Sequence, residues 1–214
     1  MSAPGAGGHA NHRVETLSTI LLAAATLATA WAGYQSSRWH GEQAKSQAAA
    51  TAGRVEATRL SGVANRKGQI DVAVFIQWVD ARATGERKLE AFYRRQFSRR
   101  LEPAFEAWVA ADPFTTAGAP RSPFDVPQYR VPEQRRSHLL EAKAGRDAEG
   151  ARVDIQRADN YVLCVVLFAS SLFFAGLSTR LPTLRGREQI LALGGVVFVA
   201  TVVWMATFPV TLSV

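Results

Sequence analysis

Cysteine is nearly absent from this sequence of 214 residues, in which Cys164 is the only one. An intrachain disulfide is therefore excluded, and Cys164 is interpreted as a small packing residue because it lies within an apolar run. The four histidines stand apart from the Cys/His/Asp spacings that metal sites need. Nucleotide-binding, dinucleotide-binding and nucleophile-elbow motifs are missing too. We therefore expect no metal, no cofactor and no enzymatic activity.

Charged side chains are missing from three long apolar runs, residues 16–34, 161–178 and 190–214. As helices rising about 1.5 Å per residue, all three are long enough to cross a hydrocarbon core about 30 Å thick. Ion and proton pathways usually need ionisable side chains inside the spans, so a transporter is disfavoured. The expected fold class is an all-α membrane protein with three transmembrane helices and an inserted helical domain outside the membrane.

The first run has a second interpretation, a cleaved secretory signal. Arg13 precedes it, and Ala30-Trp31-Ala32 resembles a cleavage site. A retained span is preferred because the run exceeds the usual signal core of about 7 to 15 residues and the helical pattern continues past Tyr34. Residues 1–15 are then a flexible N-terminal tail.

Basic residues predict the orientation of the spans. The chain has a net charge of +7, and the short connection 179–189 contains three arginines on the same side of the membrane as Arg13. Lys and Arg in short loops mark the cytoplasmic side. We therefore expect the amino terminus and this connection in the cytoplasm, and the inserted domain, residues 35–160, on the extracytoplasmic side.

Two rows of small residues in the inserted domain alternate in steps of three and four, as in the seams of coiled coils. The first row is Gly41, Ala44, Ala48, Thr51, Val55, Thr58 and Gly62, and the second is Ala144, Ala148, Ala151, Ile155, Ala158 and Val162. They predict an antiparallel coiled-coil stalk continuous with the first two spans. Chance is the alternative explanation, because alanine is the best helix former.

Between the two arms, residues 70–79 (IDVAVFIQWV) are either a core helix or a surface where another subunit binds. Residues 89–109 then keep one helix face apolar while arginines occupy the other, and Pro103 should kink or restart this helix. The basic face either lies on anionic lipid headgroups or is solvated, and interleaved glutamates favour the solvated form. Its arginines are Arg94, Arg95, Arg99 and Arg100.

Residues 112–132 contain five of the nine prolines, with Phe114, Phe124 and Tyr129 between them. Regular helix or central strand is excluded here, and an unstructured linker would usually lack aromatic residues. We expect an ordered loop at the tip of the domain. Its aromatics either dock a partner or pack on the domain's own helices. Together with the four arginines, they are the candidate contacts for a partner or for lipid.

Three segments carry a resemblance to a known group of proteins. They read YQSSRW, EPAFEAWVAADPFTTAGAPRSPFDVPQY and FASSLFFAGLSTRLPTLRGREQILALGG. The chain resembles small, uncharacterised bacterial membrane proteins with one amino-terminal and two carboxyl-terminal spans. The resemblance implies the three-span architecture and a bacterial origin, and we therefore expect a multi-pass protein of a bacterial inner membrane. It implies no activity and no site residue.

These observations favour a non-catalytic scaffold or accessory subunit that binds itself or another envelope protein through the inserted domain. The lipid bilayer and anionic headgroups are further expected partners. Nucleic acid is not expected, because the basic residues form no dense stripe and no binding motif. The alternative is a homo-oligomeric pore lined by the first span, whose Ala24, Ala28 and Ala32 permit close helix contact.

Overall fold

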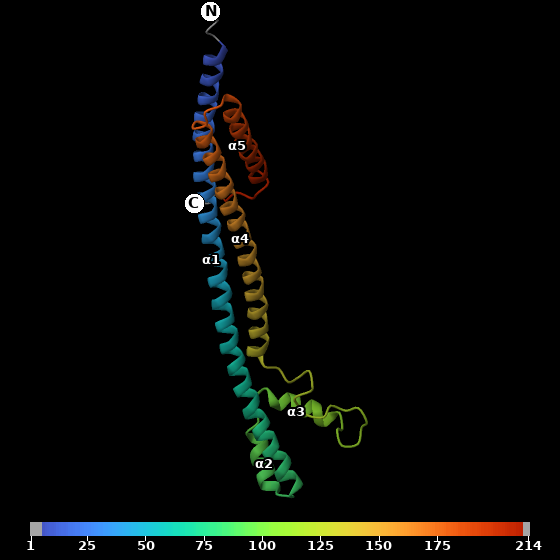
Figure 1. Ribbon diagram of the computed structural model, residues 1–214. Coiled ribbons are helices and arrows are strands. Elements are labelled where there is room, and N and C mark those ends of the chain that lie inside the picture. The colour runs from blue at the N-terminus through green and yellow to red at the C-terminus, as the bar shows by residue number, and fades with distance from the viewer. Residues whose placement is uncertain (1–5, 212–214) are drawn as a thin grey trace, which may run out of the picture. The chain divides into compact units, whose positions relative to one another are not determined.

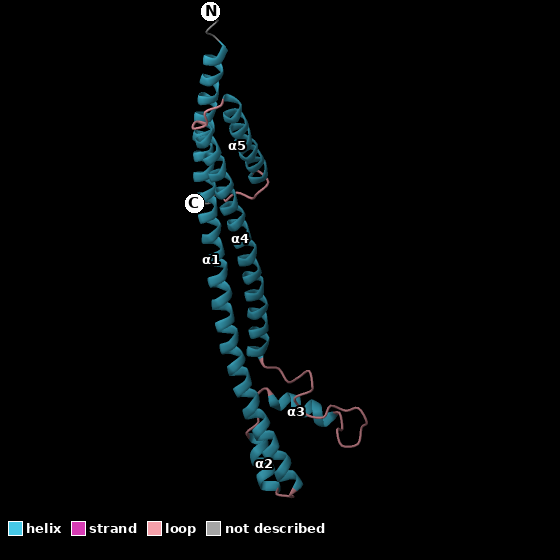
Figure 2. Ribbon diagram, viewed as in Figure 1, coloured by secondary structure: helices cyan, strands magenta, loops and turns pink. Residues whose placement is uncertain are grey.

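A computed structural model describes residues 6–211, and the side chains from His12 onward. This part of the chain contains five helices and no strand (Figures 1 and 2). The helices are α1 (Ala6–Ala83), α2 (Arg87–Arg95), α3 (Leu101–Ala110), α4 (Pro132–Ser178) and α5 (Leu184–Met205). Three of them, α1, α4 and α5, are long and apolar enough to cross a membrane. The prediction of an all-helical fold with three potential spans is confirmed.

Both ends of the chain differ from the expected boundaries. Helix α1 already begins at Ala6, so residues 6–15 are helical, and residues 1–5 of the expected tail lie outside the described part. Helix α5 ends at Met205, short of the expected third span, and residues 206–208 form turns before Pro209. Proline cannot donate to the preceding helical turn, which explains an end near this position. Residues 212–214 lie outside the described part.

The chain divides into two compact units. Unit 1 consists of Met1–Ala48 and Asp147–Val214, and unit 2 consists of Ala49–Arg146. Unit 1 thus contains the first part of α1, the last part of α4 and all of α5. Unit 2 contains the other parts of α1 and α4, together with α2, α3 and the proline-rich loop.

Unit 1 has a core of small and aromatic side chains. Its main cluster of buried residues is Ala32, Trp39, Ala158, Tyr161, Cys164 and Phe168. Cys164 is completely buried, in keeping with a packing role. Helix α5 lies very close to α4 at Gly194, where an added Cβ would be 3.1 Å from the Cβ of Phe174. Glycine is therefore needed here to let the two helices approach.

Several buried polar groups inside unit 1 find partners within the unit. The hydroxyls of Ser18 and Ser178, both buried, are 3.0 Å apart. The buried side chain of Gln35 accepts a hydrogen bond from the backbone N–H of Thr211 at 3.2 Å. Trp39 and Tyr161 both donate to the carbonyl oxygen of Pro209, at 3.3 and 3.2 Å. The segment after α5 is thereby fastened to α1 and α4.

The outward side chains of unit 1 are apolar. Leu27 on α1 is 73% exposed, and Val196 and Val203 on α5 are 66% and 63% exposed. In water this surface would be unfavourable, whereas lipid tails accept it. The outer faces of the potential spans therefore suit a bilayer.

The buried rows on α1 and α4 differ from the rows of small residues read from the sequence. On α1, Val55 is 66% exposed, and the other members of the first row are exposed or half-buried. The row that is buried in unit 2 contains Ala50, Ala57, Leu60 and Ala64. The predicted register of the first seam is therefore wrong.

For the second row, on α4, the predicted contact face agrees with the buried face at only some positions. Ala144, Ala151 and Ala158 are buried, whereas Ile155 and Val162 are 41% and 44% exposed. Alanine occupies several faces of both helices, so small residues alone do not mark the contact face. Larger side chains decide the register, because only one face places Trp39 and Trp78 in the apolar clusters of their units.

Close contact within unit 2 predicts the effect of a larger side chain. A Cβ added at Gly53 would lie 3.1 Å from the Cβ of Ala144, and Ser137 donates a hydrogen bond to the carbonyl oxygen of Ala57 at 2.9 Å. Gly53→Leu should therefore destabilise the protein by about 1–3 kcal/mol through overpacking. Denaturant unfolding in detergent, followed by circular dichroism, measures the change.

The matched control is Ala52→Leu, because Ala52 is the exposed neighbour of Gly53 on the same helix. This control should change the free energy of unfolding by no more than about 0.5 kcal/mol. Equal stability of the two variants would contradict the close packing of α1 and α4 in unit 2.

Candidate functional site

Aromatic side chains form the core of unit 2. The buried members of this cluster are Trp78, Ala104, Phe105, Trp108 and Val126. The rings of Trp78 and Phe105 meet edge to face at 4.7 Å between centroids, and Phe75 and Trp108 meet at 5.5 Å. Such pairs contribute about 0.5–1.5 kcal/mol each beyond the burial of their area. The cluster joins α1, α3 and the proline-rich loop.

The apolar stretch 70–79 has two different faces. Phe75 and Trp78 take part in the aromatic cluster, so one face is core. Ile70 and Ile76 are 63% and 56% exposed on the other face. The core interpretation is therefore confirmed for one face, and binding of another subunit stays a prediction for the exposed face.

Residues 89–109 form two helices rather than one. Helix α2 ends at Arg95 and α3 begins at Leu101, so the break precedes Pro103. The hydroxyl of Ser98 accepts hydrogen bonds from the backbone N–H groups of Arg100 and Leu101, at 3.3 and 3.2 Å, and so satisfies the start of α3. Pro103 stands in the first turn, where its missing N–H is harmless. The expectation that all four arginines share one helix face is therefore wrong.

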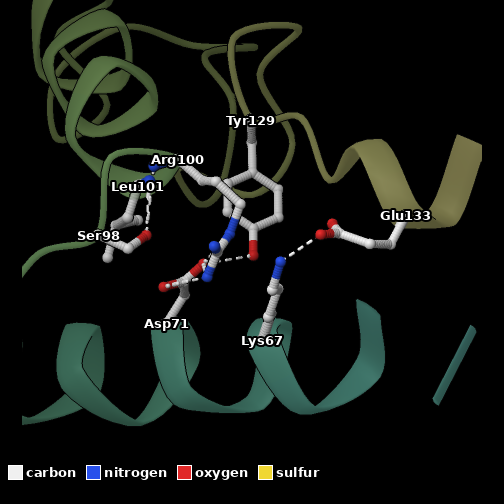
Figure 3. A network of polar contacts seen from close by, with 7 residues as sticks. All are labelled: Lys67, Asp71, Ser98, Arg100, Leu101, Tyr129 and Glu133. Atoms are coloured by element: carbon white, nitrogen blue, oxygen red, sulfur yellow. Dashed lines mark hydrogen bonds and ion pairs between the residues drawn. The ribbon is translucent and has the colours of Figure 1, made fainter. Parts of the chain in front are cut away.

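A buried carboxylate links three distant segments of unit 2 (Figure 3). Asp71 on α1 is only 1% exposed. Arg100 donates to it from Nε at 3.2 Å and from Nη2 at 3.3 Å, and the hydroxyl of Tyr129 donates to Oδ2 at 3.0 Å. This network connects α1 to the start of α3 and to the end of the proline-rich loop.

Ionisation in this region follows from burial and from charge pairing. Burial, together with the hydrogen bond to Asp71, raises the pKa of Tyr129 to about 12. Beside the network, Lys67 forms an ion pair with Glu133 at the start of α4 (Figure 3). The hydrogen bond from Lys67 lowers the pKa of Glu133. Both contacts attach the end of the loop to α1.

Four of the seven candidate contact residues have partners inside unit 2. Arg100 and Tyr129 bind Asp71. The guanidinium of Arg94 lies 4.4 Å from the ring centroid of Phe105 and forms an ion pair with Glu102. The fourth, Phe124, packs edge to face on Phe75 and Tyr129, at 5.6 and 5.0 Å. These four contribute to the shape of the unit.

The other three candidates, Arg95, Arg99 and Phe114, are exposed. Phe114 is the extreme case, with 73% of its surface accessible. Its ring lies 5.7 Å from that of Trp108, whose Nε1 donates to the carbonyl oxygen of Pro120 at 2.8 Å. The loop around Phe114 is thus tied to the aromatic cluster, and the exposed ring has a defined position.

A groove of about 610 Å³ opens beside Phe114. Its apolar walls include Trp78, Phe105 and Phe114, and its charged lining consists of three arginines, Arg82, Arg87 and Arg94, with the two carboxylates of Glu90 and Asp112. Arg82 lies over the ring of Trp78, 5.4 Å from the centroid, and its Nη1 is 2.8 Å from a carboxylate oxygen of Glu90. An apolar side chain flanked by a carboxylate would match these walls and charges. Within residues 12–211, no cluster of three potential metal ligands accompanies this groove.

Sequence reasoning identified only part of this groove. Phe114 and Arg94 were among the candidates, whereas Trp78, Arg82 and Arg87 were not. Trp78 and Arg82 are four positions apart and so share a face of α1. This spacing indicates that the two side chains are neighbours, but only the tertiary fold brings Phe114 close to them.

Comparisons of the chain with protein-family models, curated proteins and solved structures find no match. The groove and the network are therefore interpreted from their own chemistry.

Removing members of the Asp71 network should destabilise unit 2 in a defined order. Tyr129→Phe deletes one hydrogen bond to a charged group and should cost about 1.5–3 kcal/mol. Asp71→Ala leaves Arg100 without its carboxylate and should cost about 3–5 kcal/mol. Arg99→Ala, at an exposed neighbouring position, is the control and should cost less than about 0.5 kcal/mol. Chemical unfolding measures all three, and equal costs for Asp71→Ala and Arg99→Ala would refute the role of the network.

The raised pKa of Tyr129 predicts a pH dependence of stability. Unfolded tyrosine ionises near its ordinary pKa of 10.0, whereas in the folded protein Tyr129 keeps its proton until about 12. The stabilisation by this hydroxyl is therefore complete below about pH 10 and is lost as the pH rises toward about 12. The difference in unfolding midpoint between the wild type and Tyr129→Phe should shrink over this interval. A constant difference between pH 9 and pH 12, measured by denaturant titration, would contradict the assignment.

Proposed function

We propose that this protein is a non-catalytic membrane scaffold or accessory subunit that binds a partner protein through the groove beside Phe114. The observation that carries the proposal is the exposure of Phe114, 73%, on a loop fixed by Trp108 and Pro120. Large aromatic and arginine side chains are the residues that dominate protein interfaces. A ring already held in place loses little conformational entropy on binding.

The groove also indicates the chemistry of the partner. Its aromatic walls suit an apolar side chain, and Arg87 suits a neighbouring carboxylate, because Arg82 is already paired with Glu90. A volume of about 610 Å³ accepts a few side chains rather than a whole domain. We therefore propose a short segment of another envelope protein, or of a second copy, with apolar and acidic residues side by side.

The anchoring part of the proposal is a three-span protein of a bacterial inner membrane, as the resemblance to the small bacterial membrane proteins implies. In this proposal, the arginines of the amino terminus and of residues 179–189 favour the cytoplasmic side for both, and residues 35–160 lie on the extracytoplasmic side. Anionic headgroups remain proposed partners, with the exposed Arg95 and Arg99 as their contacts.

We further propose that α1 and α4 form an antiparallel coiled-coil stalk. Within unit 2, the buried residues Ala50, Ala57 and Ala64 recur every seven positions, as do Ser137 and Ala144 on α4. The contacts of Gly53 with Ala144 and of Ala57 with Ser137 give opposite chain directions. These observations support the stalk with a register different from that read from the sequence.

The pore alternative has weaker support. A water-filled lumen requires a continuous outward face of polar or small side chains on the spans, whereas large apolar side chains such as Leu27, Phe173 and Val196 are more than 60% exposed there. A lipid-facing surface accounts for these residues more directly. We therefore prefer the scaffold.

Replacing Phe114 should weaken partner binding without weakening the fold. Phe114→Ala removes an exposed ring, so we expect a loss of at least about 10-fold in captured partner and little change in unfolding. The measurement is quantitative mass spectrometry of proteins that co-purify with the full-length chain after crosslinking in native membranes.

Phe92→Ala is the matched control, because Phe92 is 47% exposed on α2 and does not line the groove. It should leave the captured partner unchanged. If Phe114→Ala retained the same partners in the same amounts as Phe92→Ala, the docking role of the groove would be rejected.

A further inference from the structure

A second groove, of about 990 Å³, lies between α1 and α5 in unit 1. Both helices contact α4, through the hydrogen bond of Ser18 with Ser178 and the close approach of Gly194 to Phe174. Val14 and Leu191 belong to one buried cluster with Ala175 of α4, against which Leu21 and Leu22 pack, and the space beside this cluster, between α1 and α5, is open. At Gly195, an added Cβ would have nothing within 4 Å. The groove is therefore open beside a tightly packed helix pair.

The length of this groove matches one leaflet of a bilayer. Its lining extends from Arg13 to Ala24 on α1 and from Glu188 to Phe198 on α5. At about 1.5 Å per residue, each stretch is about 15 Å long, which is half of a hydrocarbon core about 30 Å thick. Because the two helices run in the same direction from Val14 and Leu191, both stretches begin at the same end. A single acyl chain of one leaflet would lie along this length.

Charge is confined to one end of the groove. Among the residues whose side chains are described, Arg13 and Glu188 are its only charged lining residues, and both are exposed. The remaining lining residues are apolar, Leu17 and Ile20 among them. This is the pattern of an amphiphile site, with an apolar channel below a polar entrance.

Opposite charges at the entrance distinguish between lipid classes. A guanidinium donates two parallel hydrogen bonds to a phosphate, which favours any phospholipid. A carboxylate attracts a primary ammonium, which donates hydrogen bonds, and repels a purely anionic headgroup. Phosphoethanolamine has both required groups, whereas phosphocholine lacks N–H donors and phosphoglycerol lacks the cation.

We propose that the groove between α1 and α5 binds one phosphatidylethanolamine molecule. Arg13 binds its phosphate, Glu188 binds its ammonium group, and an acyl chain lies along Leu17, Ile20 and Gly195. The proposal concerns unit 1 and requires a bilayer, but it does not depend on partner binding at Phe114.

The test uses the full-length protein in nanodiscs with equal parts of phosphatidylethanolamine, phosphatidylcholine and phosphatidylglycerol. Native mass spectrometry after release from the nanodisc counts the retained lipids by headgroup. The wild type should retain one phosphatidylethanolamine per chain, enriched about threefold or more over the other two lipids, as expected for an ion pair near water. Equal retention of the three lipids would overturn the proposal.

Two steric variants test the channel. Gly195→Leu places its Cβ where nothing lies within 4 Å and extends a branched side chain into the open space, so it should abolish lipid retention. Gly33→Leu is the control, because Gly33 also has nothing within 4 Å and lies outside the groove. This control should retain lipid as the wild type does. Equal lipid retention by both variants would overturn the proposal. A wild-type dimer that is lost in Gly195→Leu would also overturn it, because a second copy of the chain would then be the occupant of the groove.

Two charge variants test the headgroup. Glu188→Gln should remove the preference for phosphatidylethanolamine over phosphatidylglycerol while lipid is still retained. Arg13→Gln should reduce retention of all three phospholipids, because they share the phosphate. An unchanged headgroup ratio in Glu188→Gln would show that Glu188 does not select the ammonium group and would overturn the assignment.

Discussion

Small side chains at the contact between α1 and α4 determine how closely the two helices approach in each unit. In unit 1, Ala32 and Ala158 belong to one buried cluster, and in unit 2, Gly53 lies against Ala144. Close approach leaves little room for large apolar side chains between the helices. These contacts therefore depend on dispersion and on hydrogen bonds between the helices, such as that from Ser137 to Ala57. The larger apolar side chains are left for other surfaces, and their distribution gives the two units different characters.

In unit 2, the larger side chains form a core around a buried charge. An isolated carboxylate at the position of Asp71 would be strongly unfavourable, and its attraction to Arg100 offsets the desolvation only because the geometry also includes the hydroxyl of Tyr129. The three partners come from three segments, so the network forms only when all of them are in place. It thereby selects one arrangement of a loop that has many prolines, and this arrangement leaves Phe114 exposed.

How far the sequence predicts this structure depends on how local each feature is. The potential spans follow from the absence of charge over 16–34, 161–178 and 190–214, which is a property of each segment alone. The register of α1 does not follow, because Ala48 and Ala50 are chemically alike and only the distant positions of Trp39 and Trp78 separate their faces. The contacts of Arg94 and Arg100 also depend on residues far away in the sequence. One lies on Phe105 and the other binds Asp71, so a shared basic face was a reasonable but incorrect reading of their spacing.

The two grooves illustrate a common physical principle. In unit 1, the side chains of Gln35 and Ser18 are satisfied by Thr211 and Ser178 and therefore have little capacity left for a ligand. Binding capacity remains where a side chain is fixed in position but not covered, as Phe114 is, or where a glycine leaves space in an otherwise close contact, as Gly195 does. Neighbouring glycines have opposite effects here. Gly194 is occupied by its contact with α4, so the open position beside it is rigidly placed, and rigid placement lowers the entropic cost of receiving a ligand.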